Sequence, residues 1–186
     1  MGSAWSLSVE AARWAARFYA AHWPLVLGLS LIPSLQRFMV INYGDRLPSG
    51  VGPASEVLTA GVRILLVYLI LRITVVEAGW SHLGIGERWQ RLGQGIDGRM
   101  RDFLLQFLVL GIAFVIFDVL PETAISLWAP EERKDLLQAI LVSVKNPTVI
   151  AMTILWMVGV GHQLAASRMD DLTRAVPKVG PGADGP

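Results

Sequence analysis

The sequence predicts an all-α fold: one integral membrane bundle of four transmembrane helices, with an amphipathic helix at the N-terminal end and another in an outer loop. The first observation is four apolar stretches of about 17 to 19 residues, close to the ~20 that a helix needs to cross a bilayer. The second is composition, because 53% of the 186 residues are hydrophobic and the mean hydropathy is +0.50. The third is a charged fraction of 17%, against about 25% in soluble domains. The predicted spans are residues 24–41, 60–76, 103–120 and 147–165.

The segment before the first span, residues 8–22, is predicted to form an amphipathic helix that lies in the cytoplasmic interface. Trp14 and Phe18 are four residues apart and therefore share a helix face. Arg13 and Arg17 have the same spacing and share a neighbouring face, which can remain in contact with headgroups and water.

The connections between the spans are predicted from their glycine, proline and serine content. Residues 42–59 and 79–98 are rich in these residues and are expected to be loops. The second outer connection, residues 121–146, is expected to contain an amphipathic helix, because Pro130 suits a first helical turn and an apolar face follows it. That face is formed by Leu136, Leu137, Ile140, Leu141 and Val144.

The distribution of basic residues predicts the orientation. Nine arginines and lysines fall in the N-terminal segment, the connection between the second and third spans and the tail, whereas four fall in the two outer connections. The positive-inside rule then places both termini in the cytoplasm. A three-span arrangement is the alternative, because the second span carries two arginines. Residues 1–176 are expected to form a single four-helix domain, and residues 177–186 a disordered tail.

Composition excludes several classes of function. The net charge of +1 favours neither a nucleic-acid partner nor the steering of acidic substrates. The absence of cysteine excludes disulfides, thiolate metal ligands and cysteine nucleophiles. Arginine outnumbers lysine by 13 to 3, a bias typical of GC-rich bacterial genomes. We therefore expect a multi-pass protein of the bacterial cytoplasmic membrane.

No pattern in the sequence predicts an enzyme, a cofactor or a metal site. The letters G-x-G-x-x-G at residues 93–98 lack the preceding strand that a dinucleotide site requires, so a flexible loop is expected there. His22, His82 and His162 show no metal-ligand spacing and are expected to act as interfacial anchors.

The charges inside the predicted spans are the candidate ligand- or partner-binding residues, because an arginine at a span centre costs about 2.5–3.5 kcal/mol on insertion scales. Helix direction places Arg37, Arg63, Asp118 and Glu122 at a similar outer depth, where we expect an outer polar cluster. Within it, Arg63 either pairs with Asp118 or anchors to lipid headgroups, since its side chain leans toward the outer surface.

Arg72 lies nine residues after Arg63, about half a turn round the helix at 3.6 residues per turn. The two arginines therefore face opposite sides of the second span. The nearest internal candidates for Arg72 are Gln106 and Asp102 on the third span. The alternatives are snorkelling to the headgroups and contact with another subunit or a ligand.

These features predict a non-catalytic accessory or scaffold subunit of a larger membrane complex, such as a transporter or a respiratory assembly. It is expected to bind other membrane subunits through the second span and the amphipathic helices, and to bind no nucleic acid. The alternative is a small homo-oligomeric transporter or lipid-handling protein that uses the outer cluster, because the planar arginine fork matches phosphate oxygens.

Overall fold

A computed structural model describes residues 4–46, 48 and 50–175, and in this part of the chain it contains helices and no strand. The prediction of an all-α fold with four helices long and apolar enough to span a membrane is confirmed. The tail predicted at residues 177–186 lies outside the described residues. The α-helices are α1 (Ala4–Ala21), α2 (Trp23–Tyr43), α3 (Val51–Glu77), α4 (Ile85–Gly98), α5 (Met100–Phe114), α6 (Leu120–Trp128), α7 (Glu131–Lys145) and α8 (Ala151–Ala175). Two 3-10 turns, η1 (Gly44–Arg46) and η2 (Trp80–His82), and two π-helical segments, η3 (Val115–Val119) and η4 (Asn146–Ile150), complete the described part.

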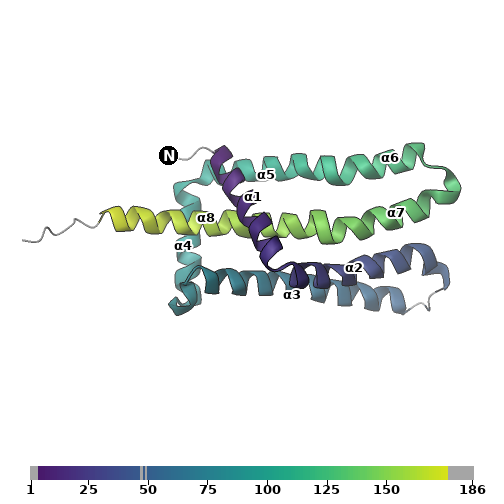
Figure 1. Cartoon of the computed structure of the whole chain (residues 1–186), viewed down its shortest axis with the longest axis horizontal. Helices are drawn as coiled ribbons and strands as arrows, with labels where there is room; N and C mark the ends of the chain where they lie inside the picture. The colour runs from purple at the N-terminus through teal and green to yellow at the C-terminus, as the bar shows by residue number, and fades with distance from the viewer. Residues whose placement is uncertain (1–3, 47, 49, 176–186) are drawn as a thin grey trace, which may run out of the picture.

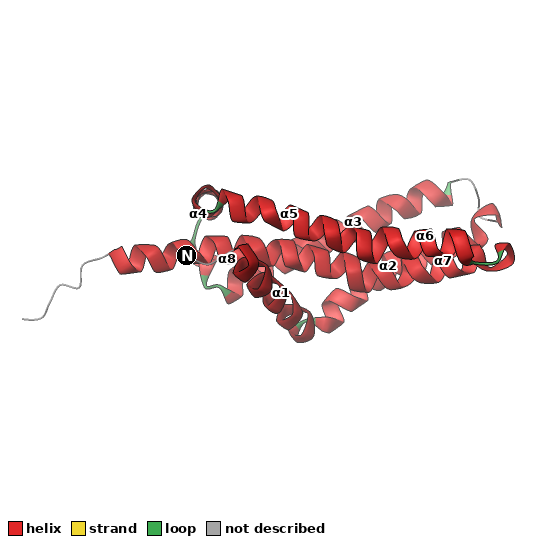
Figure 2. Cartoon of the chain, turned by 90° about the horizontal axis from the view of Figure 1, so that it is seen from above, coloured by secondary structure: helices red, strands yellow, loops and turns green. Residues whose placement is uncertain are grey.

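The four long helices form two hairpins. The helix α5–η3–α6 runs beside α7–η4–α8, which in turn runs beside the pair α2 and α3 (Figure 1). Two short helices cross α8 near the opposite end from the hairpin turns, α1 on one side and α4 on the other (Figures 1 and 2). We call this end, which holds α1 and α4, the crossing end, and the end with the turns the hairpin end.

Two of the long helices continue through prolines that were expected to end them. The third was expected to end at residue 120, but it runs from Met100 to Trp128, and the fourth runs from Glu131 through η4 into α8. A proline cannot donate to the carbonyl four residues earlier and collides with it. Here the ladder widens to π-type bonding just before Pro121 and around Pro147, which keeps both helices continuous. The helix predicted after Pro130 forms as α7, but it continues through η4 into α8 and is not separate from the fourth long helix.

Both segments that were expected to be loops are largely helical. Half of the predicted loop 42–59 is the start of α3, which tolerates Pro53 because a proline in the first turn of a helix has no backbone hydrogen bond to lose. In the predicted loop 79–98, α4 begins after Gly84, whose N–H donates to Glu87 Oε2 at 3.0 Å. An acidic side chain in this position satisfies the first turn of a helix, and the glycine content concealed that signal.

α1 packs one face against α8, as its apolar spacing requires. Leu7, Ala11, Ala15 and Phe18 recur every three or four residues and are buried. Gly159 on α8 makes this approach possible, because a Cβ there would lie 2.9 Å from the Trp14 ring and 3.1 Å from the Ala11 carbonyl oxygen.

α4 meets the other side of α8 even more closely. A Cβ at Gly95 would lie 2.4 Å from the carbonyl oxygen of Leu164, so the two backbones touch at this position. Gly95 thus serves helix packing, and residues 93–98 belong to α4 and are not the flexible loop that was expected.

Substituting Gly95 should separate these helices. We expect Gly95→Ala to lower the free energy of unfolding by about 1–3 kcal/mol, the usual cost of overpacking. Gly93→Ala is the matched control, because it lies in the same helix and its Cβ would meet no atom within 4 Å. It should leave stability unchanged or raise it by up to ~1 kcal/mol through helix propensity. Thermal unfolding of the two variants in detergent compares them, and equal melting temperatures would contradict the close crossing.

Candidate functional site

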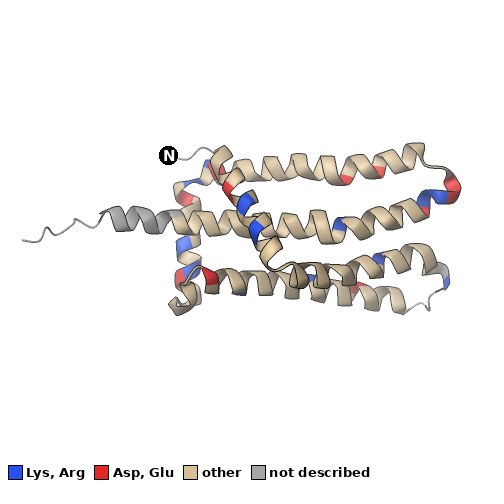
Figure 3. Cartoon of the chain, in the orientation of Figure 1, with Lys and Arg blue, Asp and Glu red and all other residues tan. Residues whose placement is uncertain are grey.

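The most deeply buried charge in the described part of the chain is Lys145, at the end of α7. Its side chain is 6% exposed, and its Nζ forms ion pairs with Asp118 and Glu122, the latter at 2.8 Å from Oε1. The two carboxylates are one helical turn apart on η3 and α6 and project from the same face. Figure 3 shows the acidic segments of this helix beside the basic segment of α7. We call Lys145, Asp118 and Glu122 the lysine triad.

The lysine triad satisfies a strict electrostatic requirement. A cation removed from water loses several kcal/mol of solvation, which only close opposite charges can offset. Two carboxylates supply that compensation, and both keep partial contact with the surroundings, with 30% and 52% of their side chains exposed. Lys145 was predicted only as a charge of the outer loop. Lys145 lies directly before the fourth apolar stretch, at the predicted depth of Asp118. This position is the signal that could have identified it as the partner of that carboxylate.

Arg63 does not reach the lysine triad. Its Nη2 donates a hydrogen bond to Oδ1 of Asn146 at 3.0 Å. Successive residues on a helix project about 100° apart, so Lys145 faces α6 while Asn146 faces α3. The fourth long helix lies between the other two (Figure 1), which is why the considered ion pair between Arg63 and Asp118 does not form.

Arg37 forms a third and separate group near the hairpin end of α2 and α3. Its Nη1 lies 3.0 Å from Oε1 of Glu56, and the Gln36 side-chain amide donates to Ser55 Oγ at 3.0 Å. The side chains of Arg37 and Glu56 are 38% and 47% exposed, so this is a partly solvated pair. The predicted outer cluster is thus three separate polar contacts between successive pairs of helices.

The two residues considered as partners of Arg72 are occupied elsewhere. Gln106 is buried and accepts a hydrogen bond from the Ser8 hydroxyl at 2.9 Å, while its amide donates to backbone carbonyls. Asp102 pairs with Arg99 at 3.1 Å. Arg72 is exposed on α3, and no described residue forms a hydrogen bond or an ion pair with its guanidinium.

The crossing end carries an aromatic stack that the sequence did not predict. The His162 ring lies between those of Trp14 and Trp80, with centroid distances of 5.7 and 5.4 Å. His22 stacks on Phe18 at 4.4 Å and lies beside Glu77. These residues come from distant parts of the sequence, so no local spacing reveals the stack. Among the described residues, no three His, Cys, Asp or Glu side chains gather as a metal site would require.

The polar contacts compensate charge and form hydrogen bonds between neighbouring helices. The lysine triad and the Arg63–Asn146 contact together contain two positive charges and two negative charges. The described residues around these contacts present no activated nucleophile and no base oriented by a third group. Comparisons with protein-family models, with curated proteins and with solved structures found no match to the chain. Function must therefore be inferred from the placement of its own residues.

Removing the central cation should leave two uncompensated carboxylates. We expect Lys145→Met to lower the free energy of unfolding by about 2 kcal/mol, less than the ~3–5 kcal/mol of a fully buried pair because the carboxylates are partly exposed. Lys134→Met is the control, since Lys134 pairs with an exposed Glu131 on the same helix and should cost under ~1 kcal/mol.

Chemical unfolding in detergent measures both variants. Adding Asp118→Asn and Glu122→Gln to Lys145→Met should recover part of the loss, because the buried charges are then removed together. The assignment of Lys145 as the electrostatic link fails if the two single lysine variants are equally stable.

Proposed function

We propose that this chain is a non-catalytic subunit of a larger membrane assembly, such as a transporter or a respiratory complex. Its four long helices would cross a bacterial cytoplasmic membrane, with both chain termini on the cytoplasmic side. The lipid bilayer and the other subunits of the assembly would then cover the apolar surfaces that the chain itself leaves open.

The observation that carries this proposal is the exposure of the helix Met100–Trp128. In the apolar 18-residue stretch of this helix, only 6% of the stretch is buried within the chain, against 22–33% in the corresponding stretches of the other three long helices. Gln106 is the one buried residue of α5. The structure describes every residue of η3 and α6, and none of them is buried. This helix contacts mainly α1 near its start and α7 near its end. Its central turns therefore offer an apolar surface of the kind that packs on a neighbouring helix.

Arg72 supports the same proposal. It is exposed on α3, with no partner among the described residues. At lipid depth a guanidinium needs an acid, a carbonyl or a headgroup, and a subunit docked on this face of α3 can supply the first two.

The charge balance of the polar contacts also favours a structural role. Lys145 and Arg37 each have carboxylate partners, and Arg63 has the Asn146 side chain. The substrate sites of many transporters are formed by broken half-helices near the midplane. Here the charges hold neighbouring helices together.

The second candidate function is a small homo-oligomeric transporter or lipid-handling protein. The π-helical segments favour it, because Asp118 lies in η3 and Asn146 in η4, and π-bulges occur frequently at functional sites. Arg63→Ala separates the candidates. Loss of uptake or lipid binding with normal assembly supports the transporter, whereas unchanged transport with a dissociated complex supports the subunit.

The membrane topology can be tested with single cysteines, because the chain contains none. Ser126 is exposed near the hairpin end and Ser81 near the crossing end. In intact bacteria, a membrane-impermeant maleimide should label Ser126→Cys at once, and Ser81→Cys only after permeabilisation. Labelling of both cysteines in intact cells would contradict the proposed orientation.

The assembly can be tested by purification of the native protein in a mild detergent. We expect larger proteins to co-purify in fixed stoichiometry, and Arg72→Ala to release them at least tenfold more readily. Arg101→Ala is the charge-matched control, because Arg101 is exposed at the start of α5 and should leave the complex intact. A monodisperse monomer without partners by mass spectrometry would overturn the proposal.

A further inference from the structure

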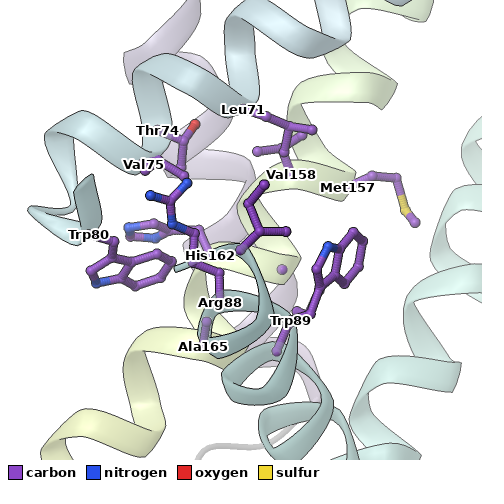
Figure 4. A pocket seen from close by; sticks show the side chains of 13 residues that line it. Leu71, Thr74, Val75, Trp80, Arg88, Trp89, Met157, Val158, His162 and Ala165 are labelled. Atoms are coloured by element: carbon purple, nitrogen blue, oxygen red, sulfur yellow. The ribbon is translucent and has the colours of Figure 1, made fainter. Parts of the chain in front are cut away.

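A cavity of about 400 Å³ lies at the crossing end, between the last turns of α3, η2, α4 and α8 (Figure 4). Its volume falls within the ~300–1,000 Å³ range of small-molecule sites. None of the residues of the lysine triad, and neither Arg63 nor Asn146, lines it. The cavity is therefore a separate feature, formed because α4 turns across the bundle.

The walls of the cavity are mainly hydrocarbon. Leu71 and Val75 come from α3, Leu92 from α4, and Met157 and Val158 from α8. Surfaces of this kind gain roughly 25 cal/mol for each Å² of apolar ligand area removed from water. They favour an alkyl chain over a sugar or another polar solute.

The polar groups of the cavity gather around Arg88 and His162. In Figure 4, Trp80 and Trp89 stand on opposite sides of the cavity, and the Arg88 side chain extends from α4 toward Thr74. Trp80 also stacks on His162 at 5.4 Å, which holds the imidazole in place. The cavity thus has a long apolar wall and a preorganised polar group, the form expected of a site for an amphiphile.

Two buried nitrogen atoms at this polar group have no hydrogen-bond partner. Arg88 Nη2 donates to the Ser81 carbonyl at 3.3 Å, but its Nε is buried without a hydrogen-bond partner, and so is Nδ1 of His162. No carboxylate of the described residues pairs with Arg88. A charged guanidinium without a carboxylate partner is costly beside an apolar wall, so a ligand oxygen on Arg88 would be favoured.

We propose that this cavity binds a single-chain anionic amphiphile, with its carboxylate or phosphate oxygens on Arg88 and His162 and its alkyl chain along the apolar wall. The positive charge of Arg88, uncompensated by the described residues, selects an acidic head over a neutral one. Charge-assisted bonds to a planar guanidinium are among the strongest available to such a head. The imidazole ring of His162 carries at least one N–H and can donate a second bond. The proposal concerns the isolated chain and does not depend on any partner subunit.

The test uses the full chain purified in a maltoside detergent and three probes with the same palmitoyl chain. Palmitate carries a carboxylate, palmitoyl lysophosphatidate a phosphate, and monopalmitoylglycerol no charge. Native mass spectrometry and equilibrium dialysis measure stoichiometry and affinity. We expect one acidic probe per chain, bound at least tenfold more tightly than the neutral probe. The tighter of the two acidic probes identifies the head group.

Arg88→Gln isolates the charge. It should weaken binding of the acidic probes at least tenfold and leave the neutral probe unchanged, so that the preference is lost. Arg101→Gln removes the same charge from an exposed position outside the cavity, and it should leave the binding of both the acidic and the neutral probes unchanged. Matching elution volumes and melting temperatures show that the variants are folded.

Gly161 provides an independent test of the apolar wall. Its Cβ would lie 3.7 Å from Leu92 Cδ1, an ordinary contact, so Gly161→Ala should keep binding. Gly161→Leu projects a larger side chain into the cavity and should abolish binding of all three probes. Equal affinity for acidic and neutral probes, unchanged binding by Arg88→Gln, or full binding by Gly161→Leu would each overturn the proposal.

Discussion

Compensation of charge inside an apolar body is the constraint on which the arrangement of the long helices depends. Each polar contact joins one pair of neighbours. Arg37 and Glu56 join α2 to α3, Arg63 and Asn146 join α3 to the helix of α7 and α8, and Lys145 joins that helix to the one carrying Asp118 and Glu122. Because a buried charge without its partner costs several kcal/mol, the contact of Lys145 in particular specifies which helix lies next to which, and the two more exposed contacts add to it. Apolar packing alone discriminates poorly between such orders.

The crossing end is organised by a different principle. There α8 is crossed by α1 and α4, and the crossings are close because Gly159 and Gly95 leave the backbones free to approach. Aromatic rings fill the space around these crossings, with His162 between Trp14 and Trp80. The angle at which α4 leaves α3 also opens the cavity beside Arg88. Tight glycine contacts and a cavity thus arise from the same change of direction.

The two proposals use different surfaces of the molecule. A partner subunit would cover the central turns of the helix Met100–Trp128 and the face of α3 that carries Arg72. An amphiphile would occupy the cavity beneath α4 and would add a negative charge next to Arg88. A ligand that fills this cavity also ties α3, α4 and α8 together, which would stabilise the crossing end in proportion to its affinity.

The sequence by itself determined the fold class and the centres of the four long helices, because a run of apolar residues as long as a bilayer is thick is a strong local signal. It also marked Asp118, Glu122, Arg37 and Arg63 as charges that require compensation. It placed the helix ends wrongly at Pro121 and Pro147, since a π-type ladder that accommodates a proline has no simple local signature. Only the tertiary structure decided that Lys145 and not Arg63 meets the carboxylates, and that a glycine-rich segment packs as a helix. The physical reason is that partner choice depends on the order and rotation of helices in space, and these follow from contacts between residues far apart in the chain.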